Sequence, residues 1–212
     1  MPELRIVDDS ELGYPRISVA RKTGGESFSL DNRALPVSLL SFWQWSTSNL
    51  AGNTMRGCLA EYIVAIALGL TDGVRKDWEA YDLQFNRWKV EVKASGYLQS
   101  WFQKRLSQPA FSIRPARKWD ALTNQMTGEL RRHADLYVFC LHDHRIKQTL
   151  NPLNLDQWMF FVVPTTRFED QKRYKHAKTI GLKSLLTLKP RVVRFSELQQ
   201  CVVEVMTHFD GA

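Results

Sequence analysis

Hydrophobic and polar residues alternate almost without exception along residues 81–93, YDLQFNRWKVEVK. This alternation is typical of β-strands that bury one face, and Asn86 and Arg87 at its centre predict a two-residue turn that folds the stretch into a hairpin. The turn fixes a register in which Leu83 lies opposite Val90. One face of the hairpin is then apolar and anchors it to the core, through Tyr81, Leu83, Phe85, Trp88, Val90 and Val92.

The other face of this hairpin brings acidic side chains together. In the same register Asp82 lies directly opposite Glu91, with Cβ atoms about 5 Å apart, an arrangement that is destabilising when both residues are charged. A divalent cation such as Mg²⁺ would turn this repulsion into ligation, since hard cations take carboxylate oxygens. Lys93 follows on the same face and would orient an attacking water beside the metal. A turn longer by one residue, which Arg87 would favour, would move the two acids out of opposition.

Two helices are expected before the hairpin. Residues 36–50 carry large apolar side chains at helical spacing and predict a helix that enters the core. A second helix is predicted over residues 54–68, with Asn53 as its N-cap and Gly69 as its stop. This second helix is apolar nearly all round, as expected of a buried element, and Glu61 is the acid inside it.

The rest of the chain alternates apolar runs with charged segments. Residues 134–142 and 158–164 are nearly continuous apolar runs, typical of central strands that are covered on both faces. Residues 96–133 predict a loop or short helix followed by a short strand, and Ser196 is expected to cap a terminal helix. Residues 1–30 predict an irregular lead-in or an accessory hairpin.

Together these elements predict an α/β fold in which a mixed central sheet is flanked by helices. A chain of 212 residues, of which 44% are apolar and 24% charged, is expected to form one domain over residues 1–212, with its core at 53–164. The net charge of +7 favours anionic partners such as nucleic acid.

Other sequence features bear on the compartment. The three cysteines are widely spaced and form no CxxC pair, so neither a disulfide framework nor a zinc ribbon is indicated. The longest apolar stretch, Cys58 to Leu70, is too short to span a membrane and contains Glu61, and the first residues lack the apolar segment of a secretion signal. We therefore expect a cytoplasmic protein with no membrane segment.

Asp82, the eight residues that follow it and the Glu91-Val92-Lys93 tripeptide resemble the PD-(D/E)XK signature of the restriction-endonuclease-like nucleases. The preceding helix, RGCLAEYIVAIALG with Glu61 inside it, is similar to the first core helix of that superfamily. The stretch EVKASGYLQSW, in which a glutamine follows the lysine, is similar to the equivalent stretch of some restriction-type proteins. Tyr81 stands where a proline is usual, a departure that is common in this divergent superfamily.

The resemblance implies a restriction-endonuclease-like fold and a catalytic site that depends on Mg²⁺, with Mn²⁺ as a substitute. By this resemblance Asp82 and Glu91 bind the metal, with the Val92 carbonyl as a third ligand. Lys93 would position the hydrolytic water. Glu61 would contact the metal through water or help to hold a second metal ion.

Substrate contacts are expected outside this set. The resemblance implies that Gln99 touches the substrate or lies at the edge of the active site. The basic tract RPARKW supplies Arg114, Arg117 and Lys118 for phosphate contacts, and a second basic tract, KRYKHAK, covers residues 172–178. Contacts of Lys and Arg with phosphates provide affinity for nucleic acid that does not depend on its sequence.

Each assignment has a structural alternative. The charged residues of the hairpin would otherwise be ordinary groups on its solvent-facing side. Glu61 would otherwise be a partly buried acid paired with an arginine such as Arg56, because buried acids are normally paired. Gln99 would be a structural residue, and the basic tracts would be solvated surface.

The sequence therefore favours a Mg²⁺-dependent nuclease that hydrolyses DNA phosphodiester bonds, and by resemblance an endonuclease of restriction, defence or repair. Recognition of DNA would come from its own loops, from a homodimer or from a partner specificity subunit. The main alternative is a non-catalytic nucleic-acid-binding or scaffold protein on the same fold. A weaker alternative is a metal-dependent hydrolase of another phosphate ester.

Overall fold

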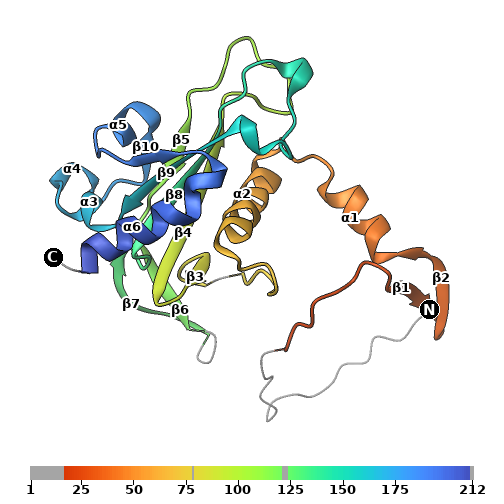
Figure 1. Ribbon diagram of the computed structural model, residues 1–212. Helices are drawn as coiled ribbons and strands as arrows, with labels where there is room; N and C mark the ends of the chain where they lie inside the picture. The colour runs from red at the N-terminus through yellow and green to blue at the C-terminus, as the bar shows by residue number, and fades with distance from the viewer. Residues whose placement is uncertain (1–16, 78, 121–123, 211–212) are drawn as a thin grey trace.

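A five-stranded mixed sheet forms the centre of the computed structural model, which describes residues 17–77, 79–120 and 124–210 (Figure 1). The strands lie in the order β11-β9-β8-β4-β3. β4 and β8 run parallel, and the other neighbours are antiparallel. Their bounds are Leu83–Phe85 for β3, Trp88–Gly96 for β4, Leu136–His142 for β8, Trp158–Pro164 for β9 and Arg191–Val193 for β11. The predicted α/β class with a mixed central sheet is confirmed.

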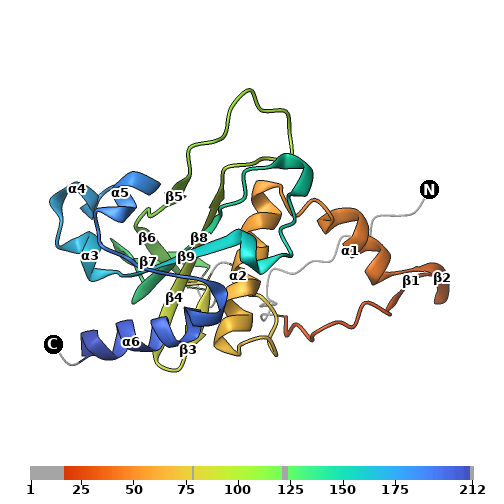
Figure 2. The same cartoon turned by 45° about the horizontal axis from the view of Figure 1, so that its top comes forward.

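Both faces of this sheet are covered (Figure 2). Helices α2 (Asn53–Leu68) and α6 (Leu198–Asp210) pack on one face. The other face carries three short helices and a small two-stranded sheet, which share its second core cluster. These elements are α3 (Thr166–Glu169), α4 (Lys172–Lys175), α5 (Leu182–Leu186), β5 (Ala110–Ser112) and β10 (Thr179–Gly181).

The two central strands are the long apolar runs of the sequence. Every residue of β8 is buried, and β9 is buried except for Met159, which is partly exposed. Strands with neighbours on both edges and layers on both faces have no polar side to present, so continuous apolar runs suit them. The strands predicted within 134–142 and 158–164 are confirmed.

Helix α2 confirms the second predicted helix, with one change at its start. The N-cap residue is Gly52 rather than Asn53, which is already the first helical residue. Gly69 ends the helix as predicted, with φ of 71° in the left-handed region that glycine adopts without strain. This helix packs Ala60, Ile63, Val64 and Leu68 into the core cluster below the sheet.

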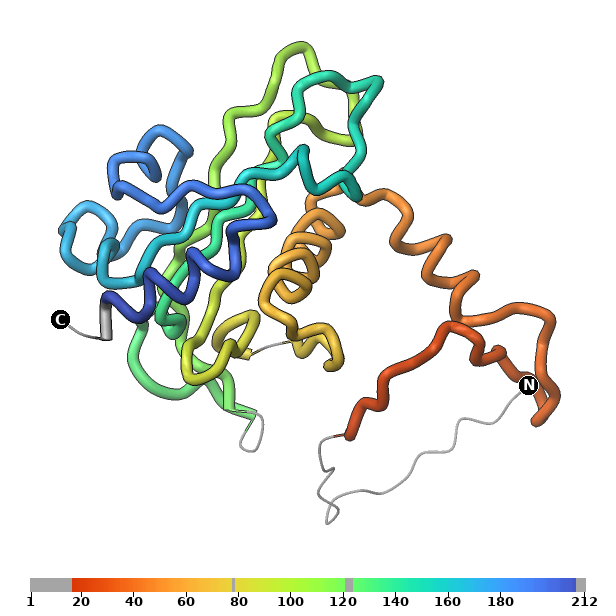
Figure 3. Tube along the Cα trace, in the orientation of Figure 1, coloured from red at the N-terminus to blue at the C-terminus, as the bar shows by residue number. Residues whose placement is uncertain are grey.

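The helix predicted within residues 36–50 is present as α1 (Leu39–Thr47), but the prediction that it enters the core is wrong. The region forms a hairpin of β1 (Ser27–Leu30) and β2 (Arg33–Ser38), followed by α1. Helix α1 buries none of its residues, and Trp45 is 84% exposed. Residues 17–50 extend away from the sheet as an arm (Figure 3). Of the lead-in, residues 17–26 are irregular and Ser27–Leu30 form the first strand of the hairpin, whereas residues 1–16 lie outside the described residues.

Two further regions differ from the predictions. The segment 96–133 contains β5 and then a ribbon of β6 (Ala116–Asp120) and β7 (Gln125–Arg131), with no helix among its described residues. The terminal helix begins at Leu198, after a 3₁₀ turn, η3 (Phe195–Glu197), that contains Ser196, so Ser196 does not cap it. Two other 3₁₀ turns, η1 (Lys147–Thr149) and η2 (Leu155–Gln157), connect β8 to β9. Among the described residues, no helix has the length and apolar character needed to cross a membrane.

Candidate active site

The predicted hairpin is the local structure on which the site is built. β3 and β4 pair in an antiparallel manner, with Leu83 opposite Val90. The turn consists of Asn86 and Arg87, and Asn86 has a φ of 53°. Asparagine tolerates this left-handed conformation better than most residues, which explains its place in the turn. The two-residue turn and its register are confirmed.

Strand pairing in this hairpin ends at Leu83, one residue before Asp82. The prediction that Asp82 lies directly opposite Glu91 is therefore wrong. Its carboxylate Oδ2 instead accepts a hydrogen bond from the Val92 N–H at 2.7 Å. The Asp82 side chain thus takes the place of a backbone hydrogen-bond acceptor at the edge of β4. The chain turns at this residue, so Tyr81 leaves the apolar face predicted for it and packs against the core cluster on the opposite face of the sheet.

Lys93 lies between the two carboxylates. Its Nζ is 2.5 Å from Glu91 Oε1 and 3.6 Å from Asp82 Oδ2. The side chains of Asp82, Glu91 and Lys93 are 20%, 19% and 26% exposed, so the group is largely buried but still reached by solvent. The structure therefore brings together the three residues predicted as the catalytic group. The Lys93 ammonium lies between the two carboxylates that were predicted to share a metal ion.

The charges of this group alter one another's protonation. Burial, with the charge of Asp82 as the next cause, raises the pKa of Glu91. Burial disfavours the charged form of Lys93, but the carboxylates of Asp82 and Glu91 outweigh it and raise the pKa of its ammonium. Burial and the neighbouring carboxylate both disfavour the ionised form of Glu91, and a bound cation would favour it.

These residues fit a Mg²⁺ ion by their donor chemistry. Mg²⁺ is bound in proteins through one or two carboxylates, with water and substrate phosphate as the other ligands, and Asp82 and Glu91 provide two. In an extended strand the N–H and C=O groups of a residue point to the same side. Since the N–H of Val92 points to Asp82, its carbonyl oxygen faces the same edge of β4.

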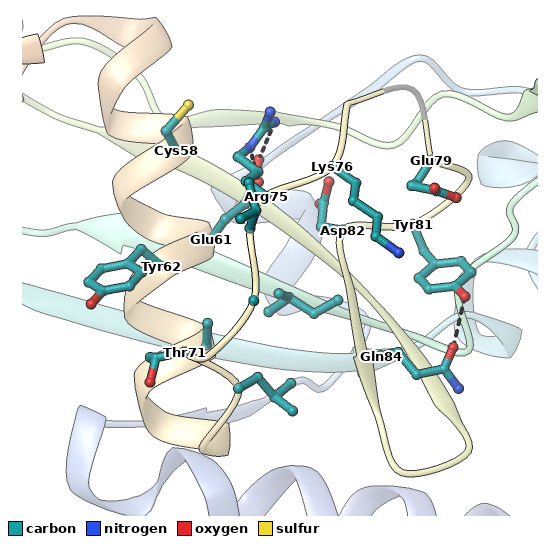
Figure 4. Close-up of a pocket in the computed structure, with 15 residues that line it drawn as sticks. Cys58, Glu61, Tyr62, Thr71, Arg75, Lys76, Glu79, Tyr81, Asp82 and Gln84 are labelled. Atoms are coloured by element: carbon teal, nitrogen blue, oxygen red, sulfur yellow. Dashed lines mark hydrogen bonds and ion pairs between the residues drawn. The ribbon is translucent and has the colours of Figure 1, made fainter. Parts of the chain in front are cut away.

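Glu61 reaches this edge from α2 but is held by an arginine. Arg75 donates from Nε to Glu61 Oε2 at 2.5 Å and from Nη2 to Oε1 at 3.1 Å (Figure 4). The carboxylate is 15% exposed, and burial raises its pKa although the Arg75 hydrogen bond opposes this. The charges of Asp82 and Lys93 also act on it, so it belongs to the same electrostatic group. The structural alternative, a partly buried acid paired with an arginine, therefore holds for Glu61, with Arg75 as the partner in place of Arg56.

A pocket of about 290 Å³ opens between α2, the loop at residues 70–79 and the start of β3 (Figure 4). Glu61 and Asp82 both line it, whereas Glu91 and Lys93 do not. Lys76 adds a cation to its wall. Sequence reasoning missed Arg75 and Lys76, and the only signal for them was a basic pair just after the Asp72-Gly73 turn.

Gln99 has a structural position. Its side chain is 8% exposed. Its Oε1 accepts from Arg56, and its Nε2 donates to the Gly96 carbonyl and to Ser107 Oγ. These bonds hold the loop after β4 against the first turn of α2, where the Arg56 guanidinium also donates to the Leu98 carbonyl. The geometry matches the structural alternative for Gln99.

The basic residues expected to contact substrate lie outside the carboxylate pocket. Arg117 and Lys118 are exposed on β6, and Arg114 is exposed just before it. None of the three lines the pocket that contains Asp82. The structure gathers other basic residues at the β3–β4 turn, the start of β4 and the end of β7, namely Arg87, Lys89 and Arg131.

Within residues 17–77, 79–120 and 124–210, no cluster of three or more His, Cys, Asp or Glu side chains is arranged to hold a metal ion. A metal at this site would therefore depend on two carboxylates completed by the backbone, water or substrate. Comparison of the chain with models of known protein families gives no match, and comparison with curated proteins gives none either.

Proposed function

We propose that this chain is a metal-dependent nuclease of the PD-(D/E)XK, restriction-endonuclease-like type, which hydrolyses phosphodiester bonds of DNA. The observation that carries the proposal is the convergence of Asp82, Glu91 and Lys93 at the open edge of β4. Two carboxylates that can bind one divalent metal ion, with a lysine beside them, form the minimal group for metal-assisted hydrolysis of a phosphate ester.

In this proposal Asp82 and Glu91 hold Mg²⁺, or Mn²⁺ in its place, with the Val92 carbonyl completing the protein ligands. The bound ion would neutralise charge on the scissile phosphate. Lys93 then gives up its contact with one carboxylate and donates a hydrogen bond to the attacking water. Glu61 interacts electrostatically with Asp82 and Lys93 and would act on the metal in the same way, while Arg75 offsets its negative charge.

A biological role in restriction, defence or repair in the cytoplasm agrees with this chemistry and with the net charge of +7. Cutting both strands of a duplex would need a homodimer or a partner specificity subunit. The exposed arm at residues 17–50 supports such a partner, because neither a nine-residue helix nor a two-stranded hairpin is stable without packing.

A second candidate is a nucleic-acid-binding or scaffold protein without turnover. One observation favours it: Lys93 already contacts both carboxylates, so part of the negative charge of the site is offset without a metal. In that case the ion group would hold the edge of β4 together and take no part in chemistry.

Cleavage of supercoiled plasmid tests the proposal. Wild-type protein should nick or linearise plasmid with Mg²⁺ or Mn²⁺ and not with EDTA, and Glu91→Gln should not cut. Glu204→Gln is the control, since Glu204 is an exposed acid on α6 that, like Glu91, pairs with a basic residue, here Arg191. Cutting by Glu91→Gln at the wild-type rate would refute the site. Lack of cutting by folded wild-type protein on plasmid and on single strands would favour the binding role.

A further inference from the structure

The β6–β7 ribbon is an unusually exposed element. Its strands form a sheet of their own and pair with no other strand among the described residues. Every residue of β7 is exposed, including Met126 at 56% and Leu130 at 62%. An isolated two-stranded ribbon is only marginally stable in water, so this one is expected to gain stability from a partner that it contacts.

The ribbon carries basic residues on both strands. Arg117 and Lys118 are exposed on β6, and Arg131 is exposed at the end of β7. Two acids, Asp120 and Glu129, offset part of this charge. Lys118 pairs with Thr127, the neighbour of Met126, and Leu130 is the neighbour of Arg131, so the basic and the apolar side chains lie on opposite faces of the ribbon. The basic face suits contact with DNA phosphates.

A cleft at the base of the ribbon adds to this charge. It has a volume of about 480 Å³ and lies between the β3–β4 turn and the end of β7. Arg87, Lys89, Arg131 and His133 line it, together with two acids, Asp135 and Glu169. The Asp135 carboxylate is engaged, because it accepts the backbone N–H of Lys89 at 2.7 Å.

The same cleft leads to the candidate active site along β4. Lys89, Glu91 and Lys93 alternate with the buried residues Val90 and Val92, so they share one face of the strand. The Lys89 ammonium lies 5.7 Å from the centre of the Tyr81 ring, next to Asp82. A phosphate backbone held in the cleft would therefore continue toward the carboxylates.

We propose that the chain binds duplex DNA with the β6–β7 ribbon in the major groove and with the phosphates of one strand in the cleft at its base. The major groove of B-form DNA admits a two-stranded ribbon. The inference rests on the proposed function and deepens it by naming the form of the substrate. The cationic cleft supplies charge complementarity to the phosphates, and Lys118 and Arg131 on the ribbon extend it.

Binding measured without cleavage tests this inference. The full-length protein is titrated in EDTA against a short fluorescein-labelled DNA duplex, and anisotropy is followed over a range of salt concentrations. Lys118→Ala and Arg131→Ala should each weaken binding and reduce the slope of log K against log salt by about 0.9 per lost phosphate contact. Lys183→Ala on α5 is the matched control, an exposed lysine that belongs neither to the ribbon nor to the lining of the cleft, and should leave the slope unchanged.

An RNA duplex of the same sequence tests whether the ribbon binds in the major groove. The major groove of A-form RNA is too deep and narrow for side chains to read, so the RNA should bind at least about tenfold more weakly at equal salt. Equal binding of the two duplexes, or an unchanged slope in Lys118→Ala and Arg131→Ala, would overturn the ribbon model of binding.

The outcomes for the ribbon and for the nuclease are separate. A protein that cuts plasmid but binds duplex equally well after both ribbon substitutions would be a nuclease that uses another surface. A protein that binds through the ribbon but never cuts would retain this inference while the proposed hydrolysis fails. A protein that binds no duplex in EDTA or in Ca²⁺ would overturn the inference.

Discussion

Lys93 and Glu91 form an ion pair on one face of β4, with the Lys93 Nζ 2.5 Å from Glu91 Oε1. Two residues apart in a strand, they point the same way, and Asp82 approaches the same ammonium to 3.6 Å. In the metal-free protein the lysine thus stabilises two acids that would otherwise repel each other.

Lys93→Met should therefore destabilise the metal-free protein. Removing one member of a largely buried ion group leaves uncompensated charge and costs on the order of 3 kcal/mol in free energy of unfolding. Urea denaturation in EDTA at neutral pH measures this cost, and addition of Mg²⁺ should recover part of it. Lys93→Arg, which keeps the charge, is the control. Equal stability of Lys93→Met and wild type would show that the acids do not depend on the ammonium.

The stabilisation by Mg²⁺ should increase with pH. The pKa of Glu91 is raised in the folded state, so the folded protein binds a proton there more tightly than the unfolded chain does. Stability from this residue is then present at low pH and is lost as pH rises above its ordinary pKa of 4.5 toward the raised value. A bound cation favours the ionised form and restores the loss. Melting temperatures measured with Mg²⁺ and with EDTA should diverge as pH rises in wild type. They should stay parallel in Glu91→Gln.

Asp82→Ala and Asp82→Asn should differ in stability although both lose the charge. The Asn side chain still offers an oxygen to the Val92 N–H, whereas Ala leaves that donor at the strand edge to solvent. The difference between the two variants should be about 1 kcal/mol, the usual net worth of one hydrogen bond. Denaturant titration of both variants in EDTA measures it. Equal stability would mean that water replaces the carboxylate without cost.

The hairpin could be predicted closely because its information is local. Alternation fixes which residues face the core, and the turn fixes which residues pair, so Leu83 was correctly placed opposite Val90. The prediction failed one residue later. A side-chain acceptor at Asp82 competes with backbone pairing, and a pattern of apolar and polar positions does not describe that competition.

Long-range partners explain the other differences. Arg75 and Glu61 are fourteen residues apart, in a loop and a helix, and the sequence of neither segment indicates that the two residues pair. The helix predicted over residues 36–50 has the apolar spacing of a core helix, yet the chain leaves it outside the sheet. Hydrophobic periodicity identifies an apolar face that favours burial, but it does not show whether the residues that bury it belong to the same chain.

His142 should make the protein sensitive to acid. Its ring stacks on Trp158 at 4.7 Å between centres, and burial lowers its pKa to about 4. The unfolded chain takes up a proton near the ordinary pKa of 6.5, so stability falls as pH drops from there toward 4, by up to about 3 kcal/mol. Urea denaturation across this range should show a flatter profile for His142→Gln than for wild type. His176→Gln, at an exposed histidine, should keep the wild-type profile, and a steep profile in His142→Gln would assign the acid sensitivity elsewhere.

Arg75 should control how strongly the site attracts a divalent cation. It neutralises Glu61 through two hydrogen bonds, and Glu61 acts electrostatically on Asp82 and Lys93. Arg75→Ala should tighten Mg²⁺ binding about fivefold, the effect of about 1 kcal/mol from an unscreened unit charge a few ångströms away. Its cost in stability should stay below about 1 kcal/mol, because Arg75 is nearly half exposed.

Arg191→Ala is the matched control, since Arg191 pairs with Glu204 at 3.0 Å on the far edge of the sheet. Calorimetric titration with Mg²⁺ separates the two variants. If both bind Mg²⁺ as the wild type does, Glu61 does not belong to the metal site, and its ion pair with Arg75 serves only to tie the loop at residues 70–79 to α2.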